Sequence, residues 1–159
     1  MNRSSSPWSE QSSDDASKTG LRPPQNIEAE RSALGCALLD TRASELLLAE
    51  LEDDDFYEPA HRAISAAMRS LTLKKKPVDT ITVAEELERT DQLEAIGGRS
   101  YLLTLPDAAP ILSNAEYYIS IVLEKSLLRQ IITTLDQVKG MAYSADEANK
   151  VLDLAAAKL

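Results

Sequence analysis

One stretch decides the fold: Ser113–Lys150, which reads SNAEYYISIVLEKSLLRQIITTLDQVKGMAYSADEANK. It predicts two helices joined by a turn at Lys139–Ser144. A capping box, in which a serine hydroxyl and an acidic side chain satisfy free N–H groups at a helix start, opens the first helix at Ser113–Glu116 and the second at Ser144–Glu147. Gly140 is placed to end the first helix in the left-handed region.

The first of these helices carries two apolar stripes. At about 27 residues and 1.5 Å per residue it would be about 40 Å long. A helix that only covers a core needs one stripe, so we expect a core on one side and a hairpin partner or a second subunit on the other. The alternative is a helix buried on all sides within a single domain. The first stripe comprises Tyr117, Ile121, Leu128, Ile131, Leu135 and Val138, and the second comprises Tyr118, Ile119, Val122, Leu123 and Ile132.

Composition favours an all-α protein. The chain has 159 residues, which suits one domain with at most a subsidiary element. Hydrophobic residues make up 43% but aromatic residues only 4%, so the core must be mainly aliphatic. Helix-forming residues are abundant and there are only 5 glycines.

The charge balance argues against strong DNA binding. The formal net charge is −9 and the pI is about 4.6, so the chain repels phosphate backbones. The basic run Lys74–Lys76 is interpreted as a solvated helix end in preference to a phosphate site.

Cysteine and histidine are too few for a disulfide framework or a Cys/His zinc site. Cys36 and His61 are the single residues of their types, and Cys36 lies in an apolar run that predicts a buried thiol. The sequence contains neither a membrane span nor an apolar run typical of a secretory signal. We therefore expect a cytoplasmic protein.

Three regions are expected along the chain: a disordered polar tail at 1–25, a globular helical head at 26–110 and a helical hairpin at 111–159. Trp8 in the tail is either a docking anchor or a chance or vector-derived residue. Asn26 is a good N-cap for the first helix of the head. Gly35 lies in the middle of that helix, which predicts that a neighbouring backbone packs closely against it.

Local signals predict several further features of the head. Phe56 follows an acidic run and is expected to plug the core, and Pro59 suits the first turn of the next helix. That helix should bury Ile64, Met68 and Leu71. Further on, Thr82–Glu85 resembles a capping box, Gly97 suits a helix end, and a short helix at Ser100–Leu105 is expected to stop at Pro106.

No catalytic, cofactor-binding or metal-ligating residues are predicted. A nucleophile with its base, paired carboxylates in a cleft and a cofactor loop are all missing from the pattern, which favours an interaction or assembly module. His61 lacks partners at a catalytic spacing and is interpreted as a capping or packing residue. The alternative is a small hydrolase using Asp53–Asp55 with His61, which bound metal in the purified protein would support.

Five groups of residues resemble those of a known family in order and spacing, over about residues 23–135. They are Asn26–Gly35 (NIEAERSALG); Asp55–Tyr57 with His61-Arg62; Pro77–Asp79 with Ile81–Val83; Leu93–Gly98 (LEAIGG) with Tyr101-Leu102; and Asn114 with Tyr117-Tyr118 and Ile121-Val122. Together they resemble the N-terminal domain of bacterial replicative DNA helicases of the DnaB type. Departures from the family pattern are Cys36, Asp91-Gln92 and Leu112-Ser113.

The resemblance implies a helical head followed by a protruding antiparallel hairpin. Such domains assemble as homo-oligomers, with dimers as the units of a three-fold collar above a hexameric motor. The C-terminal domain of primase docks on the collar hairpins, and helicase loaders act nearby. A stand-alone helical adaptor derived from the same domain is the alternative, and a phosphate loop encoded beyond Leu159 would distinguish the two.

No enzymatic activity is expected for this chain. The resemblance places ATP and Mg²⁺ in a RecA-like motor domain of a parent ATP-dependent 5′–3′ DNA helicase, and no Walker motif occurs in the sequence. The stop within a helical pattern favours an excised domain over a truncated relative.

The candidate contacts lie in the hairpin. Tyr117, Ile121, Leu128, Ile131 and Leu135 are expected to bury against the second hairpin helix, through Val151 and Leu152, or against another hairpin. The full set of candidate contact residues is Tyr117, Ile121, Leu128, Ile131, Leu135, Val138, Val151 and Leu152.

Overall fold

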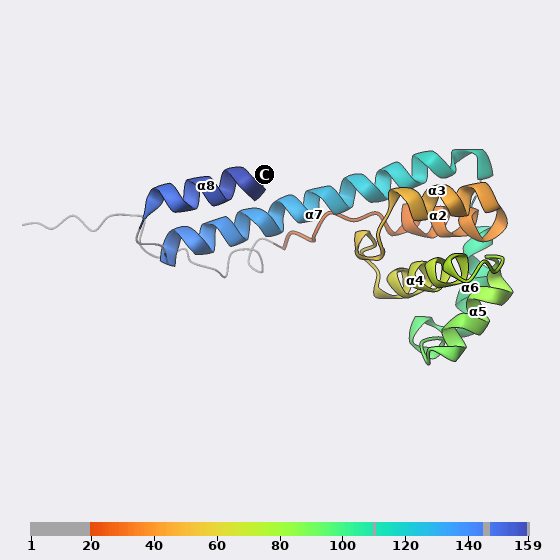
Figure 1. Ribbon diagram of the computed structural model, residues 1–159. Helices are drawn as coiled ribbons and strands as arrows, with labels where there is room; N and C mark the ends of the chain where they lie inside the picture. Colours follow the sequence, from red (N-terminus) through yellow and green to blue (C-terminus); the bar gives the residue numbers. More distant parts are fainter. Residues whose placement is uncertain (1–19, 110, 145–146, 159) are drawn as a thin grey trace, which may run out of the picture.

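A computed structural model describes residues 20–109, 111–144 and 147–158, which form helices and no strand. The predicted all-α fold, a head followed by a protruding antiparallel hairpin, is confirmed (Figure 1). Trp8 lies outside the described residues. The helices are α2 (Ile27–Leu39), α3 (Thr41–Glu50), α4 (Pro59–Leu73), α5 (Thr80–Arg89), α6 (Gly98–Asp107), α7 (Ala115–Ser144) and α8 (Ala148–Lys158), with short 3-10 helices η1 (Asp53–Asp55), η2 (Glu94–Ile96) and η3 (Leu112–Asn114).

Helix α2 lies at the centre of the head and contacts α3, α6 and α7. Its predicted N-cap is confirmed, because the Asn26 side chain accepts a hydrogen bond from the Ala29 N–H at 2.9 Å. The close approach predicted at Gly35 is also confirmed. A Cβ atom there would lie 2.1 Å from the Leu105 carbonyl oxygen, so α6 crosses α2 at a distance only glycine allows.

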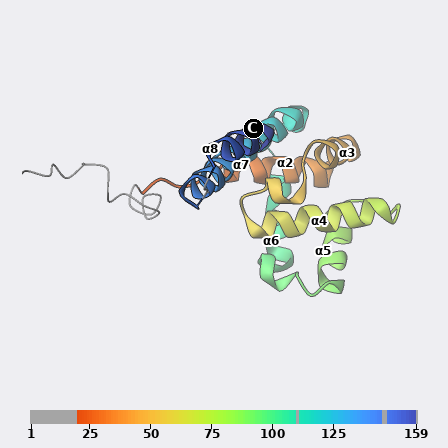
Figure 2. The same cartoon turned by 60° about the vertical axis from the view of Figure 1, so that its left-hand side comes forward.

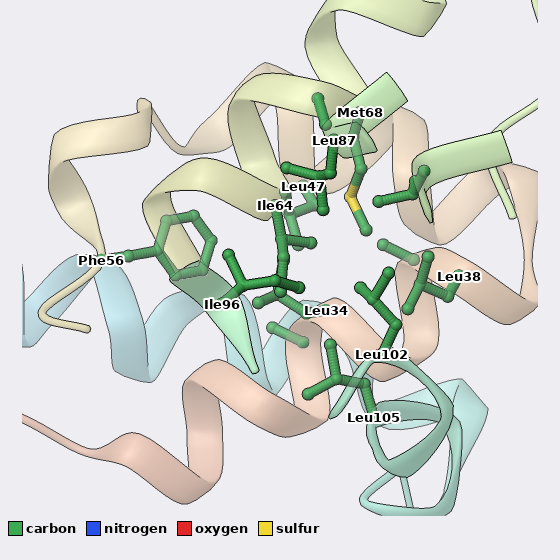
Figure 3. Close-up of a cluster of buried hydrophobic side chains, with 14 of the residues drawn as sticks. Leu34, Leu38, Leu47, Phe56, Ile64, Met68, Leu87, Ile96, Leu102 and Leu105 are labelled. Carbon is green, nitrogen blue, oxygen red and sulfur yellow. The ribbon is translucent and has the colours of Figure 1, made fainter. Parts of the chain in front are cut away.

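The core is aliphatic, as its composition predicts. Phe56 is fully buried between the acidic run and α4, and Ile64 and Met68 of α4 are buried with it (Figure 3). Pro59 is the first residue of α4, where its missing N–H leaves no hydrogen bond unmade. Figure 3 shows these side chains meeting those of α2 and α6, including Leu34.

Two predicted helix boundaries in the head are wrong. Asp79, and not Thr82, is the N-cap of α5: its carboxylate accepts from the Thr82 N–H, and the Thr82 hydroxyl accepts from the Asp79 N–H. The box therefore starts three residues earlier than predicted. Gly97 ends η2 in the left-handed region at φ 103°, as expected, but α6 passes through Pro106 to Asp107.

The predicted turn at Lys139–Ser144 is also wrong. Helix α7 starts at Ala115 and continues for 30 residues through Gly140 to Ser144. The Ser144 hydroxyl donates back to the Gly140 carbonyl, as it does within a helix. An exposed glycine costs a helix only about 1 kcal/mol, which the neighbouring turns offset. Residues 145 and 146 of the second predicted capping box lie outside the described residues.

Helices α7 and α8 lie side by side in both views (Figures 1 and 2) and extend away from the head. No helix among the described residues offers an apolar stretch long enough to cross a membrane. The basic run Lys74–Lys76 directly follows the end of α4, in agreement with its interpretation as a helix end.

A buried carboxylate links α4 to α5. Glu86 accepts hydrogen bonds from Arg89, Lys74 and Ser70, each at 2.7 Å, and these bonds hold the pKa of Glu86 well below its usual range. A folded-state pKa below the unfolded value, about 4.3 for glutamate, means that this stabilisation is complete above that pH and is lost as the pH falls below it.

We therefore predict that Glu86→Gln weakens the acid dependence of stability. Between about pH 4.3 and pH 2, the wild type should lose more unfolding free energy than the variant. Urea unfolding at stepped pH values measures the two slopes. Equal slopes would contradict the inferred role of Glu86. Exposed Glu94→Gln serves as the control, because Glu94 makes no ion pair with described residues.

Candidate partner-binding surface

The first half of α7 belongs to the head. Ile119 and Val122 are buried in the main core cluster, and Tyr118, Ile121 and Leu123 pack partly against it. This confirms that one side of the helix faces a core. Ser126 is the last residue of α7 that the head buries.

Polar contacts fasten α7 to the head where that burial ends. The Ser126 hydroxyl donates to the Asp55 carboxylate, and the Arg129 guanidinium donates to the backbone carbonyls of Asp55 and Pro24. The same guanidinium lies over the Tyr57 ring, 5.7 Å from its centre. No spacing in the sequence predicts this junction, because Asp55 and Ser126 are 71 positions apart. The hairpin therefore leaves the head from a fixed anchor.

Beyond Ser126, α7 presents apolar side chains to solvent. Leu128, Ile131 and Leu135 are 39%, 46% and 50% exposed, although each is a large aliphatic residue. At 3.6 residues per turn, all the exposed aliphatic positions from 127 to 135 fall within one arc of about 140°. We call this set the hairpin strip: Leu127, Leu128, Ile131, Ile132 and Leu135.

Helix α8 packs along the outer end of α7, and the hairpin strip stays exposed. Val138 and Met141 of α7, and Val151 of α8, are partly buried, whereas the hairpin strip is exposed. The Lys158 amine donates to the Gln137 side chain, which sets α8 antiparallel to the outer part of α7. Leu152 and Leu154 of α8 are also exposed.

The candidate contact residues therefore fall into two groups. Tyr117 and Ile121 lie at the head end of α7, beyond the reach of α8: Tyr117 is 66% exposed and Ile121 packs partly against the head core. The other six, from Leu128 to Leu152, lie in the hairpin. Four exposed apolar residues of α7 and α8 lie outside the candidate set, because they fall off its heptad spacing: Leu127, Ile132, Tyr143 and Leu154.

The residues of the hydrolase alternative are engaged in separate structural contacts. His61 is fully buried, with Nδ1 2.6 Å from the Glu30 carboxylate and Nε2 2.7 Å from the Tyr101 hydroxyl. Burial raises the pKa of Tyr101, which keeps its hydroxyl proton in place. Asp53 accepts from Ser65 and pairs with Arg69. These contacts join neighbouring elements of the head.

The Glu30 carboxylate also accepts from the backbone N–H groups of Tyr57 and Glu58. Glu30, His61 and Tyr101 thus connect α2, α4 and α6, and His61 is a packing residue as predicted. Across residues 20–109, 111–144 and 147–158, no three His, Cys, Asp or Glu side chains gather closely enough to hold a metal ion.

Comparison with known proteins agrees with this architecture. Residues 22–124 match the family described as "DnaB-like helicase N terminal domain". The replicative DNA helicase DnaB of Geobacillus stearothermophilus is 45% identical over 142 residues, which cover 86% of this chain and 30% of that relative. The replicative DNA helicase DnaC of Bacillus subtilis is 43% identical over 125 residues, which cover 79% of this chain and 28% of that relative.

A solved structure is similar over nearly its whole length. The crystal structure of the N-terminal domain of DnaB helicase from Mycobacterium tuberculosis is 42% identical and aligns with a TM-score of 0.81, covering 86% of this chain and 98% of that one. The chain spans less than a third of the length of the curated relatives named above. The resemblance noted in the sequence is confirmed. The chain belongs to the family of DnaB-like helicase N-terminal domains, the N-terminal domain of replicative DNA helicases.

Proposed function

We propose that this domain is a collar module, which assembles replicative helicase subunits through its hairpin and docks other replication proteins. The hairpin strip is the observation that carries the proposal. Five aliphatic side chains stay exposed on one face of α7, between the head that buries the first half of the helix and α8 that packs on its outer end. Full burial of an exposed aliphatic side chain is worth about 1.5–3 kcal/mol, and these side chains are 39–50% exposed, so covering each one with a second hairpin would contribute about 1 kcal/mol.

In this proposal the chain divides by role into a head at 26–110, which also buries the first half of α7, and an assembly arm formed by the rest of 111–159. The Asp55–Ser126–Arg129 anchor supports the arm, because it fixes the direction of α7 where the helix leaves the head. A fixed arm loses little conformational freedom when it pairs, which favours assembly in one defined geometry. Dimers formed through the arms would be the units of a hexameric collar.

The partner we propose for the outer hairpin is the C-terminal domain of the cognate primase. Isothermal titration with the two isolated domains tests this. The wild type should bind, and Leu152→Asp with Leu154→Asp should weaken binding at least about tenfold, because charges would enter an apolar contact. Leu103→Asp places the same charge on an exposed apolar site of the head and should leave binding unchanged. Absence of wild-type binding would contradict the primase assignment.

The collar role predicts weak binding to single-stranded DNA. The net charge of −9 repels phosphates, and counterion release cannot offset that repulsion without a basic patch. A gel-shift assay near 150 mM salt should show no shift of a labelled oligonucleotide at submicromolar protein. A saturable submicromolar complex would contradict a purely protein-binding role.

A further inference from the structure

A polar cavity lies between α2 and the end of α6, away from the residues of the hairpin strip. Its volume is about 470 Å³, large enough for a side chain and the backbone next to it. Both charge signs line it. The lining residues are Glu28, Arg31, Ser32, Thr104, Asp107 and Ala108.

Arg31 is the unusual member of this lining. Its Nε atom is buried and makes no hydrogen bond with any described residue. Buried polar atoms are almost always paired, and an unpaired one costs about 1–3 kcal/mol. Arg31 also forms no ion pair within the described parts of the chain. The terminal guanidinium nitrogens, which are not among the buried unpaired atoms and have no hydrogen-bond partner among the described residues, are the donors that an acceptor entering the cavity can reach.

Some of the other lining side chains already form hydrogen bonds within the protein, and others form none. The Ser32 hydroxyl donates to the Ala108 carbonyl, and the Thr104 hydroxyl donates to the Tyr101 carbonyl. Glu28 and Asp107, in contrast, make no ion pair or side-chain hydrogen bond with described residues. The cavity thus offers one guanidinium donor and two carboxylate acceptors.

This combination selects the class of ligand. A free anion would meet Arg31 but also two carboxylates, and a free cation would meet the carboxylates but also Arg31. A ligand that carries a carbonyl acceptor and a basic group a few ångströms apart satisfies all three. The last turn of a helix that ends in Lys or Arg has this arrangement, with unpaired carbonyls beside a basic side chain.

We propose that the cavity binds a basic peptide segment of a partner protein, with Arg31 donating to a backbone carbonyl and Glu28 and Asp107 holding the basic side chain. The net charge of −9 supports this choice, because it attracts basic segments to the domain. The site uses residues of α2 and α6 only, so it is independent of the proposed hairpin assembly.

N-acetyl-arginine amide is a suitable probe, because it carries two carbonyl groups and one guanidinium. In ¹⁵N-correlation spectra, amides of residues 28–32 and 104–108 should shift in a saturable manner at millimolar probe. Arg31→Gln and Asp107→Asn should each weaken this binding at least about fivefold, whereas Arg42→Gln on α3 should not. Circular dichroism of each variant verifies that the helices are retained, and Asp107→Asn tests the site with Arg31 intact.

Acetate and guanidinium chloride, each at the same concentration, separate the ligand classes. Either ion alone should shift these amides much less than the probe. Acetate binding as tightly as the probe would overturn the proposal in favour of an anion site. If no amides shift locally, or if they shift equally in Arg31→Gln and the wild type, the proposal is overturned, because Arg31 then binds water and not the probe.

Discussion

Gly35→Ala is expected to lower the unfolding free energy of the domain by about 3 kcal/mol, the upper range for adding a methyl group to a packed core. The added Cβ would lie 2.1 Å from the Leu105 carbonyl oxygen and 2.9 Å from its carbonyl carbon. Both atoms are backbone, so no side-chain rotation can relieve the contact. Helix α6 would have to move away from α2 and open the core around Leu34 and Leu102.

Urea unfolding followed by circular dichroism measures this effect, and Gly140→Ala is the matched control. Both glycines lie inside helices, but a Cβ at Gly140 meets no atom within 4 Å. Alanine at 140 should therefore stabilise its helix, by up to about 1 kcal/mol. Equal unfolding midpoints for Gly35→Ala and the wild type would contradict the close crossing of α2 and α6.

The second large effect is expected in the hairpin strip. Replacing both Leu128 and Leu135 by aspartate removes two large apolar contacts from any hairpin-to-hairpin interface. Full burial is worth about 1.5–3 kcal/mol for a leucine and these two are about half exposed, so the lost contacts should raise the dissociation constant by about 10–10². The charges add a desolvation cost in the same direction. The two residues are 39% and 50% exposed in the single chain, so the head should stay folded.

The features of the head that sequence predicts correctly rest on local chemistry. Asn26, Pro59 and Gly97 act through their own backbone or side-chain geometry, which neighbouring residues reveal. Gly35 was predictable for a related reason: glycine in a helix interior is unfavourable unless something occupies the space of its Cβ. Gly140 carries the same local signal and misled the prediction, since nothing in the sequence tells an exposed helical glycine from a helix end.

Contacts between residues far apart in the sequence could not be predicted from it. Ser126 and Asp55 are 71 positions apart, and His61 and Tyr101 are 40 apart, so no spacing rule connects them. The candidate surface was predicted in part for the same reason. Periodicity identified two stripes on the long helix, but it could not locate Ser126 as the point where the head stops covering them.

Sedimentation velocity of the isolated domain over a range of concentrations tests most directly whether the hairpin strip drives assembly. The wild type should sediment as a dimer or larger species at micromolar concentration, and Leu128→Asp with Leu135→Asp should sediment as a monomer with unchanged helix content. Thr133→Asp with Leu73→Asp, which carries the same added charge outside the hairpin strip, should associate like the wild type. A monomeric wild type would contradict assembly through this surface. So would equal association of the Leu128→Asp with Leu135→Asp variant and the Thr133→Asp with Leu73→Asp control.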